Sequence, residues 1–415
     1  MKLAVVSDTH FGFKWNSERN EDSFQNAREA FKKAKKADAV LLPGDIFDSK
    51  TPNQEVFSEA FKIFKLLGDD RDDAARIKNY RWKNNKTPVI AIHGTHERRS
   101  NEYVNPIELL EEAGVLIHLH NDYVTLEKEG ERVNIFGMSG VPERYASEIL
   151  KNWSPTPRKG INVLMLHQSI ENFVYTDKIN KGLSLSDIPD GFDYIIDGHI
   201  HWKNLDFESR EMPLVFPGST ITTQVRKKEA EEEKGIIFID TEKRDISFEP
   251  LKSPRDVFHL EIDVSEMEGR EIVDELIEQV EDISLEKDKK PLVRVVLKGK
   301  TEASFSNKEI REKIDSAIIK IGDNTEGIQD TDKSIDTGKK VNELGFRYIS
   351  RDFSFNGIRE IFEKLCEEET KSVLERFEEK NLEELKDFME KINEEKNEEK
   401  DVKKDGKTVL DYFGG

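Results

Sequence analysis

Aspartate and histidine residues recur in short groups along the first half of the chain. The groups are Asp8-Thr9-His10, Gly44-Asp45, Gly94-Thr95-His96-Glu97, His167 and Gly198-His199-Ile200-His201. Carboxylates and imidazoles bind divalent metal ions, and two such ions about 4 Å apart can activate water and neutralise the charge of a phosphate group. These residue types, in this order, predict a two-metal phosphoesterase.

The candidate ligands divide into two sets that share the Asp45 carboxylate. We assign Asp8, His10 and His201 to one metal ion, and His167 and His199 to the other. Such mixed nitrogen and oxygen sites suit Mn, Fe or Zn. His96 remains outside both sets, and imidazole titrates near physiological pH, so we expect His96 to protonate the leaving 3′-oxygen.

Each group follows an apolar run that is typical of a buried strand. The runs read LAVVS, AVLLP, VIAIH, NVLML and YIID. Their aliphatic and β-branched residues favour strands covered on both faces, and sites in α/β proteins form at the carboxyl ends of such strands. Residues two apart in an extended segment point the same way, which would aim Asp8 with His10, and His199 with His201, at one point.

Residues 1–252 alternate apolar strands with helical patterns, as in one α/β domain. Helical patterns run from Ala27 to Ala37 and from Glu55 to Leu67. Later short strands suggest a second sheet packed on the first, and they lie near Val124–Leu126, Val133–Phe136, Leu214–Phe216 and Gly235–Ile239. Two prolines within residues 250–254 indicate a linker.

Residues 253–350 are expected to form a small α/β cap. Its predicted elements are a strand His259–Val264, a helix Glu266–Ile283, a strand Leu292–Lys298, a helix Asn307–Ile321 and a strand near Arg347–Ser350. Residues 351–393 then read as a helical arm whose apolar stripes either form a hairpin or bind a partner. Residues 394–415 read as a flexible acidic tail.

The composition fits a protein of two or three domains in a reducing compartment. The chain has 415 residues, is 36% hydrophobic and 36% charged, and carries a formal net charge of -20. Residues 1–100 hold 19 Lys and Arg against 15 Asp and Glu, so the acidity lies outside the first motifs. Cys366 is the single cysteine, which excludes an intramolecular disulfide. With no signal peptide and no apolar stretch of membrane-spanning length, we expect a soluble, cytoplasmic protein without membrane partners.

The motif order resembles the calcineurin-like metallophosphoesterases, whose blocks run D-x-H, G-D-x-x-D, G-N-H-D/E, H and G-H-x-H. Within them, LMLHQSI, DGHIH and PGST, with the cap and terminal helices, are most similar to the SbcD-type nucleases, also called meiotic recombination eleven. The resemblance implies a four-layer αββα sandwich with a small α/β cap and a C-terminal helical arm. It also implies two Mn²⁺ ions, other divalent metals being acceptable, and a DNA exonuclease and endonuclease of prokaryotic double-strand-break repair that works with a coiled-coil, SbcC-like ABC ATPase.

One position departs from the family pattern. Thr95 stands where the third block has an asparagine that binds metal, and a hydroxyl is a poorer ligand than an amide carbonyl. We therefore expect a weaker second metal site, with activity retained.

Other candidates concern DNA, a second copy of the chain and partner proteins. For DNA binding they are Arg76, Lys78, Arg81, Trp82, Lys83, Arg98 and Arg99. By the resemblance, Phe57, Phe61 and Phe64 would pair two protomers, and Val373, Leu374, Phe377, Leu382, Leu385 and Phe388 would bind the ATPase. The tail resembles a sliding-clamp peptide with Leu410 and Phe413 as its plugs, and a frayed terminus is the alternative.

Two rival functions remain open at this point. One is a phosphatase or phosphodiesterase of the same superfamily that acts on small or nucleotide substrates. The other is a scaffold subunit with a weakened metal site, for which Thr95 is the only support. His118 and His120 also form an H-x-H pattern, but no acidic block accompanies them, and we interpret them as structural.

Overall fold

The computed structural model describes most of the first 323 residues. The described residues are 1–69, 73–80, 86–99, 103–171, 173, 182–206, 213–265, 267–283, 289–299, 310 and 313–323. All of them belong to one compact unit, residues 1–328. The predicted cap strand near residue 347, the helical arm and the acidic tail lie outside the described residues.

The first sheet has six strands in the order β13-β12-β1-β2-β4-β5. Their bounds are Asp245–Pro250, Gly235–Asp240, Lys2–Val5, Ala39–Pro43, Val89–Ile92 and Ile117–His118. The strands β1, β2, β4 and β5 are parallel, whereas β12 and β13 form an antiparallel edge. All of β2 and β4 is buried, as their continuous apolar sequences predict.

The second sheet has seven strands in the order β10-β11-β9-β8-β7-β6-β3. Their bounds are Asn204–Asp206, Leu214–Phe216, Tyr194–Asp197, Ile161–Leu166, Glu131–Gly137, Asp122–Lys128 and Arg76–Ile77. The strands β11, β9, β8 and β7 are parallel. Both sheets thus contain a central parallel part in which the carboxyl ends of neighbouring strands meet.

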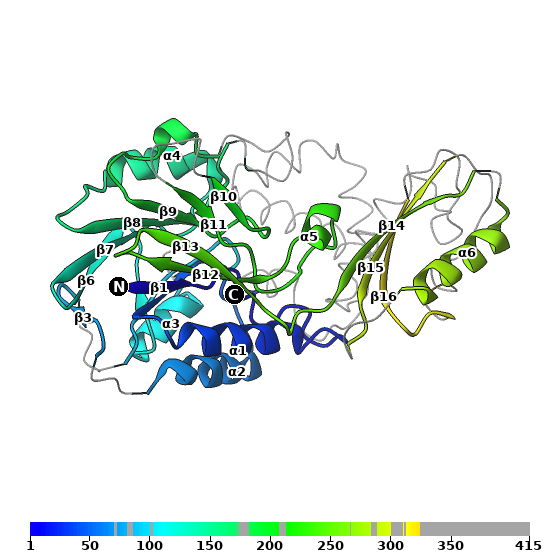
Figure 1. Cartoon of the computed structure of the whole chain (residues 1–415), viewed down its shortest axis with the longest axis horizontal. Helices are drawn as coiled ribbons and strands as arrows, with labels where there is room; N and C mark the ends of the chain where they lie inside the picture. The colour runs from blue at the N-terminus through cyan, green and yellow to red at the C-terminus, as the bar shows by residue number, and fades with distance from the viewer. Residues whose placement is uncertain are drawn as a thin grey trace, which may run out of the picture. The chain divides into compact units, whose positions relative to one another are not determined.

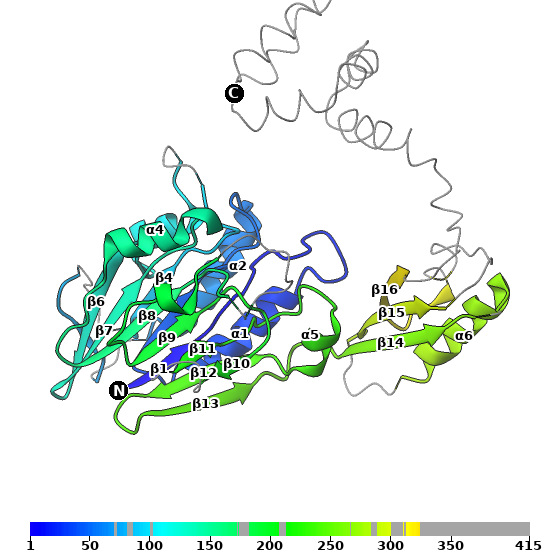
Figure 2. The ribbon, with the colours of Figure 1, turned by 90° about the horizontal axis from the view of Figure 1, so that it is seen from above.

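Helices cover the outer face of each sheet (Figures 1 and 2). On the first sheet they are α1 (Asp22–Ala34), α2 (Gln54–Phe64) with the 3-10 turn η1 (Lys65–Leu67), and α3 (Pro106–Glu112). On the second sheet they are α4 (Glu143–Trp153) and the 3-10 turn η2 (Leu185–Asp187). The short helix α5 (Lys227–Glu231) lies between β11 and β12 in the chain.

The side chains of each strand point alternately to its two faces, which divides the apolar residues of the two sheets between three cores. Leu3 and Val5 of β1 point to the core between the sheets, whereas Ala4 points to the helices of the first sheet. In β8, Met165 likewise points between the sheets and Leu164 points to the side of α4. This period of two gives the expected four layers, αββα.

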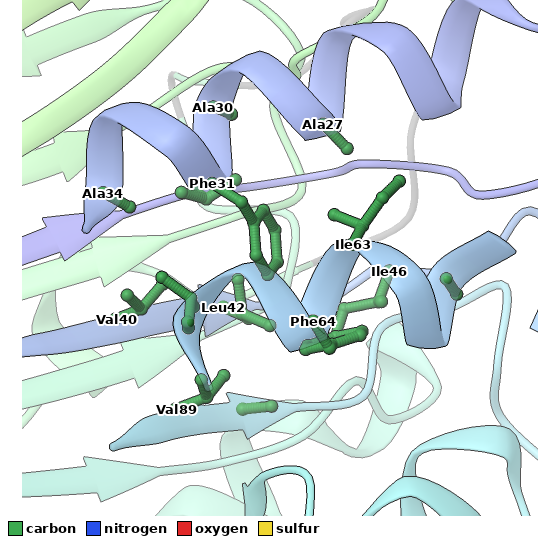
Figure 3. Packing of buried hydrophobic residues seen from close by; sticks show 14 of the residues in the cluster. Ala27, Ala30, Phe31, Ala34, Val40, Leu42, Ile46, Ile63, Phe64 and Val89 are labelled. Atoms are coloured by element: carbon green, nitrogen blue, oxygen red, sulfur yellow. The ribbon is translucent and has the colours of Figure 1, made fainter. Parts of the chain in front are cut away.

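Aromatic and small side chains share the core between the first sheet and its helices (Figure 3). Ala27, Ala30 and Ala34 let α1 lie close to its neighbours, and Phe31 meets Phe64 of α2 edge to face with ring centroids 5.2 Å apart. Phe64 is 4% exposed, so the prediction that it contacts a second protomer is wrong. Its own chain already covers that ring.

The residues after the linker form a third sheet with its own core. The strands β14 (Val257–Asp263), β15 (Leu292–Lys298) and β16 (Ile318–Asp323) are parallel, and α6 (Gly269–Glu281) shares a separate apolar cluster with them. The prediction of a helix that continues to Ile321 is wrong at the helix end, because the whole of Ile318–Asp323 pairs as a strand with residues 292–297 of β15. Three β-branched isoleucines in that stretch suit a strand better than a helix.

No helix within the described residues is long and apolar enough to cross a membrane.

Candidate metal centre

The predicted ligands follow the carboxyl ends of five strands. Asp8 and His10 follow β1, Asp45 follows β2, and Thr95 with His96 follows β4, all in the first sheet. The ligands of the second sheet follow β8 and β9, and they are His167, His199 and His201. Because the sheets pack face to face, these strand ends come together at one edge of the sandwich.

The first predicted ligand set is assembled in the structure. One ligand atom from each of Asp8, His10, Asp45 and His201 lies within 4.8 Å of all the others, and all four residues are buried. The Nε2 atoms of His10 and His201 are 3.3 Å apart, and the His201 Nε2 atom is 3.7 Å from the Asp8 Oδ1 atom. Such separations allow the atoms to surround a single ion.

The second set also lies close to Asp45. His167 Nε2 is 3.2 Å from Asp45 Oδ2, and the His167 and His199 ring centroids are 5.3 Å apart. The Thr95 hydroxyl donates to the same Asp45 Oδ2 over 3.4 Å. The Asp45 carboxylate therefore lies close to members of both predicted ligand sets.

The backbone reaches this arrangement through left-handed residues, which the extended-chain argument did not foresee. Asp8, His10 and Asp45 have φ angles of 49°, 43° and 46°. Non-glycine residues in this region cost about 1–3 kcal/mol each and concentrate at functional sites. The ligand atoms of Asp8 and His10 do lie close together. The left-handed backbone after β1 brings them there, and not the alternating side-chain direction of an extended strand.

Two glycines allow the strands to approach the ligands closely. Gly44 has a φ of +94°, and a Cβ there would lie 2.3 Å from the Nδ1 atom of His167. A Cβ on Gly198 would lie 1.9 Å from the carbonyl oxygen of Pro43. Any side chain at either position would displace the ligand loops.

Burial and mutual charge set the protonation of the ligands. Burial raises the pKa of Asp8 well above its usual value, partly offset by the charge of His167. Burial would also raise the pKa of Asp45, but the charge and hydrogen bond of His167 hold it well below the usual value. The pKa of His167 is raised well above its usual value because Asp45 outweighs the effect of burial. The cluster therefore has an anion at its centre, which suits a cation.

One buried atom in this cluster, Oδ1 of Asp8, lacks a hydrogen-bond partner among the described residues. Leaving a buried polar atom unpaired costs about 1–3 kcal/mol. The same Oδ1 atom lies 3.7 Å from Nε2 of His201 in the first predicted ligand set. An unpaired carboxylate oxygen in this cluster fits the binding of a divalent cation.

Comparison with known proteins agrees with this geometry. Residues 1–203 match the family described as calcineurin-like phosphoesterase.

The chain contains a calcineurin-like phosphoesterase domain.

With its buried Asp and His cluster, the chain is a hydrolase of phosphate esters that depends on divalent metal ions.

Three relatives extend the similarity beyond this phosphoesterase domain, and each is named DNA double-strand break repair protein Mre11. The one from Sulfolobus acidocaldarius is 27% identical over 72% of this chain and 75% of its own length. The relative from Methanopyrus kandleri is 23% identical over 82% of this chain and 76% of its own length. The relative from Saccharolobus solfataricus is 22% identical over 90% of this chain and 94% of its own length. The chain is thus distantly related to the Mre11 proteins over most of its length.

His96 lies at the mouth of the phosphoesterase site. Its side chain is 43% exposed, and its Nε2 atom is 4.0 Å from Asp45 Oδ2. The Nδ1 atom lies 2.9 Å from the carbonyl oxygen of Asp48, to which it can donate. Burial would lower the pKa of His96, but Asp45 and Asp48 together raise it above the ordinary value.

The sequence reasoning missed Asp48, a residue of the phosphoesterase site. Asp48 lies 3.2 Å from Nδ1 of His10 and 3.6 Å from Nδ1 of His96, so it orients both rings. It is the last aspartate of the G-D-x-x-D block, which was the available signal. Glu97 is fully buried and does not face the ligands, because its carboxylate accepts from the backbone N–H groups of Phe47 and Gly94.

The structure places the described DNA-binding candidates in two regions. Arg98 is exposed two positions after His96, whereas Arg99 donates to the Val104 carbonyl oxygen over 3.0 Å. Arg76 and Lys78 lie at the edge strand β3, and Lys78 pairs with Glu127 over 2.9 Å. The register of β3 on β6 and β7 puts them away from the end of the sheet that carries His167.

The remaining candidates divide between the surface and the part of the chain that is not described. Phe57 and Phe61 are half-buried on α2 and pack against the core, with the rings of Phe57 and Phe47 4.9 Å apart. The following candidates lie outside the described residues: Arg81, Trp82, Lys83, Val373, Leu374, Phe377, Leu382, Leu385, Phe388, Leu410 and Phe413.

Proposed function

We propose that this chain is a Mn²⁺-dependent DNA nuclease that acts in double-strand-break repair together with a coiled-coil ABC ATPase. The observation that carries the proposal is the convergence of Asp and His side chains from five strand ends around Asp45. The names of the three Mre11 relatives support DNA as the substrate.

The site residues would divide the work of phosphodiester hydrolysis. Asp8, His10 and His201 would hold one ion and His167 with His199 the other, while Asp45 bridges them and Thr95 approaches the second. When bound, the two ions would supply an activated water molecule and neutralise the phosphate charge. The buried ligands exclude bulk water, so the scissile phosphate has to enter from the exposed side of His96.

His96 would deliver the proton that the leaving oxygen needs. Its raised pKa favours the imidazolium at neutral pH, and the Asp48 carbonyl oxygen holds its Nδ1–H. That contact leaves Nε2–H directed to the site, where it can donate to the departing 3′-oxygen. General acid catalysis of this kind contributes about 10²- to 10⁴-fold to the rate.

A row of basic side chains across the third sheet supports a nucleic-acid partner. His259, Arg294 and Lys320 are register partners on three adjacent strands, and they point to the face opposite the α6 core. With Arg226 and Lys227 they line a groove of about 420 Å³ whose lining residues include no carboxylate. In a chain of net charge -20, such a groove is suited to the phosphates of a DNA strand.

Protein partners are part of the same proposal. We propose a homodimer whose contacts include exposed apolar side chains, namely Tyr103, Val104 and Leu109 at 46–61% exposure, and the half-buried Phe57 and Phe61. The ATPase-binding arm and the sliding-clamp peptide remain predictions from the sequence, as does a cytoplasmic location.

A single assay separates the proposal from its rivals. Purified full-length chain is incubated with Mn²⁺ and end-labelled linear duplex DNA, and in parallel with a chromogenic phosphodiester. We expect DNA cleavage by the wild type and a loss of about 10²-fold or more in His96→Ala, with Arg144→Ala as the control on α4.

Each other outcome favours a different function. Cleavage of the small ester with intact DNA would favour the superfamily phosphodiesterase. Inertness toward both substrates, even with the ATPase added, would favour the scaffold subunit. A His96→Ala variant as active on DNA as the wild type would remove His96 from the mechanism.

A further inference from the structure

Two oppositely charged side chains are buried behind the proposed metal site and have no role in the reaction described above. Glu229 of α5 and Lys234 are 4% and 6% exposed, and the Lys234 Nζ atom donates to Glu229 Oε1 over 2.9 Å. Burying such a pair gains little stability, because desolvation consumes most of the attraction. The hydrogen bonds that Glu229 and Lys234 make to their neighbours therefore indicate the role of the pair.

Lys234 holds the backbone of a predicted metal ligand. Its Nζ atom donates to the carbonyl oxygen of His201 over 2.9 Å and to the hydroxyl oxygen of Ser219 over 3.1 Å. The backbone N–H of Ser219 also donates to the His201 carbonyl over 3.1 Å. The main chain at His201 is thus fixed by a charge that Glu229 balances.

Glu229 holds the loop that reaches the imidazole ring of the same histidine. Its two carboxylate oxygens accept from the backbone N–H groups of Thr223 and Gln224 over 3.1 and 3.0 Å. The Thr223 hydroxyl oxygen lies 2.6 Å from Nδ1 of His201. A closed circuit therefore runs from the ring of His201 through Thr223, Glu229 and Lys234 to the carbonyl oxygen of His201.

The start of this loop is also anchored, from the side of α1. Asn26 donates to the Thr220 carbonyl oxygen over 2.9 Å, and Arg19 donates to the Thr222 carbonyl oxygen over 2.5 Å. Arg19 itself pairs with Asp22 over 3.0 Å. The loop that carries Thr223 is therefore held at both ends by buried polar side chains.

This circuit determines which nitrogen of His201 faces the cluster. Nε2 is the atom close to Asp8 and His10, so Nε2 has to offer a lone pair and Nδ1 has to carry the proton. A hydroxyl oxygen 2.6 Å from Nδ1 can accept that proton's hydrogen bond. Partners of this kind fix the tautomer and orientation of ligand histidines.

We infer that Thr223 is a positioning residue for His201, and that the Glu229–Lys234 pair holds Thr223 and the His201 backbone in place. The inference rests on the proposed function for the role of His201 as a ligand. It concerns residues outside every motif of the site, since Thr223 lies 22 positions after His201.

The test compares Thr223→Val, which removes the hydroxyl, with Thr223→Ser, which keeps it. Thr125→Val is the control, because it deletes a buried hydroxyl of β6 that donates to Oδ1 of Asn134 in β7. Full-length proteins with ¹⁵N-labelled histidine give the tautomer of His201 in long-range ¹H–¹⁵N spectra without metal, with His201→Gln assigning the signals. Calorimetry then measures binding of Mn²⁺.

We expect the Nδ1–H tautomer in the wild type, Thr223→Ser and Thr125→Val, and its loss or mixing in Thr223→Val. One Mn²⁺ affinity should fall about 10- to 100-fold in Thr223→Val alone. A wild-type spectrum in Thr223→Val, or equal defects in the valine and serine variants, would overturn the inference. Absence of Mn²⁺ binding in the wild type would instead contradict the proposed function, and the metal-free spectra would still decide the role of Thr223.

Discussion

Thr95 is the residue at which this site differs most from its family's pattern. Its hydroxyl donates to Asp45 Oδ2 over 3.4 Å, where the family has an amide carbonyl that binds metal. A hydroxyl that donates to the bridging carboxylate weakens the negative charge that this carboxylate offers to a cation. The substitution would therefore leave the proposed site in place but change one ligand of its second ion.

Restoring the amide should strengthen the binding of that second ion. In Thr95→Asn we expect the weaker of two Mn²⁺ affinities to rise about tenfold, equivalent to about 1.4 kcal/mol. Calorimetric titration of the full chain measures both affinities, and Thr9→Asn, beside the other ligands, is the position-matched control. Two unchanged affinities in Thr95→Asn would show that position 95 does not bind metal here.

His118 should make the stability of the protein sensitive to mild acid. Its Nε2 atom lies 3.0 Å from Nδ1 of His93, and burial with the nearby charge of His120 lowers the pKa of His118 to about 4. In the unfolded chain the pKa is near 6.5. The unfolded state therefore binds the proton first, and stability that is present above pH 6.5 is lost as the pH falls toward 4.

The variant His118→Gln removes this titration and keeps polar groups on the side chain. From pH 7 to pH 4, we expect the free energy of unfolding of the wild type to fall by about 2 kcal/mol more than that of the variant. This is less than the pKa shift of His118 alone would give, because the ring is only half-buried and solvent screens part of the effect. Urea denaturation at several pH values measures the difference. Parallel pH curves for the two proteins would exclude His118 as the source.

At the scale of single residues, type and order in the sequence predicted which side chains the structure brings together, but not their geometry. Asp8 and Asp45 could be chosen because each follows an apolar strand, and such local order is visible in a sequence. Their left-handed backbone angles and the partner of His201 depend on contacts between distant segments. Thr223 carries no local signal, because threonines also occupy positions 220 and 222 of the same stretch.

At the scale of elements, the helix α3 shows how local chemistry sets a boundary. Asn105 accepts from the backbone N–H groups of Ile107 and Glu108, and Glu108 accepts in return from the N–H of Asn105. Pro106 occupies the first helical turn. This capping box starts the helix and fixes where Ile107 and Leu110 enter the core.

Removing this cap should destabilise the phosphoesterase domain. We expect Asn105→Ala to lower the free energy of unfolding by about 1 kcal/mol and Asn105→Asp to have a smaller effect, since aspartate is also a good cap. Urea denaturation of the full chain gives both values. An alanine variant as stable as the wild type would mean that the box does not stabilise α3.

The buried strands of the first two sheets were easier to predict from the sequence than β16, the last strand of the third sheet. β2 and β8 are short apolar runs that end at polar motifs, and both are buried strands. The stretch that includes β16 combines helix-forming and β-branched residues, so local preference does not decide its structure. Pairing with β15 along its full length does, and that contact is absent from local sequence.

At the scale of the whole molecule, a net charge of -20 has to coexist with the proposed binding of DNA. The basic groove concentrates positive charge where the third sheet meets the α5 segment, and none of the residues that line it is acidic. Binding to a local patch of this kind depends strongly on salt, because each phosphate contact releases condensed counterions.

Neutralising that groove should weaken DNA binding in a measurable way. In Arg294→Ala with Lys320→Ala, we expect the slope of log affinity against log salt concentration to become shallower by about 2, with affinity reduced for any DNA sequence. Lys298→Ala, on the same sheet but paired with Glu261 over 2.5 Å, is the control. An unchanged slope would place the DNA on another surface.

The proposed activity depends most directly on two cations bound at the shared carboxylate of Asp45. Crystals soaked in Mn²⁺ and measured at the manganese absorption edge locate such ions without reference to activity. We expect two anomalous peaks about 4 Å apart, one beside Asp8, His10 and His201 and the other beside His167 and His199. An empty site at saturating Mn²⁺, or peaks remote from Asp45, would contradict it.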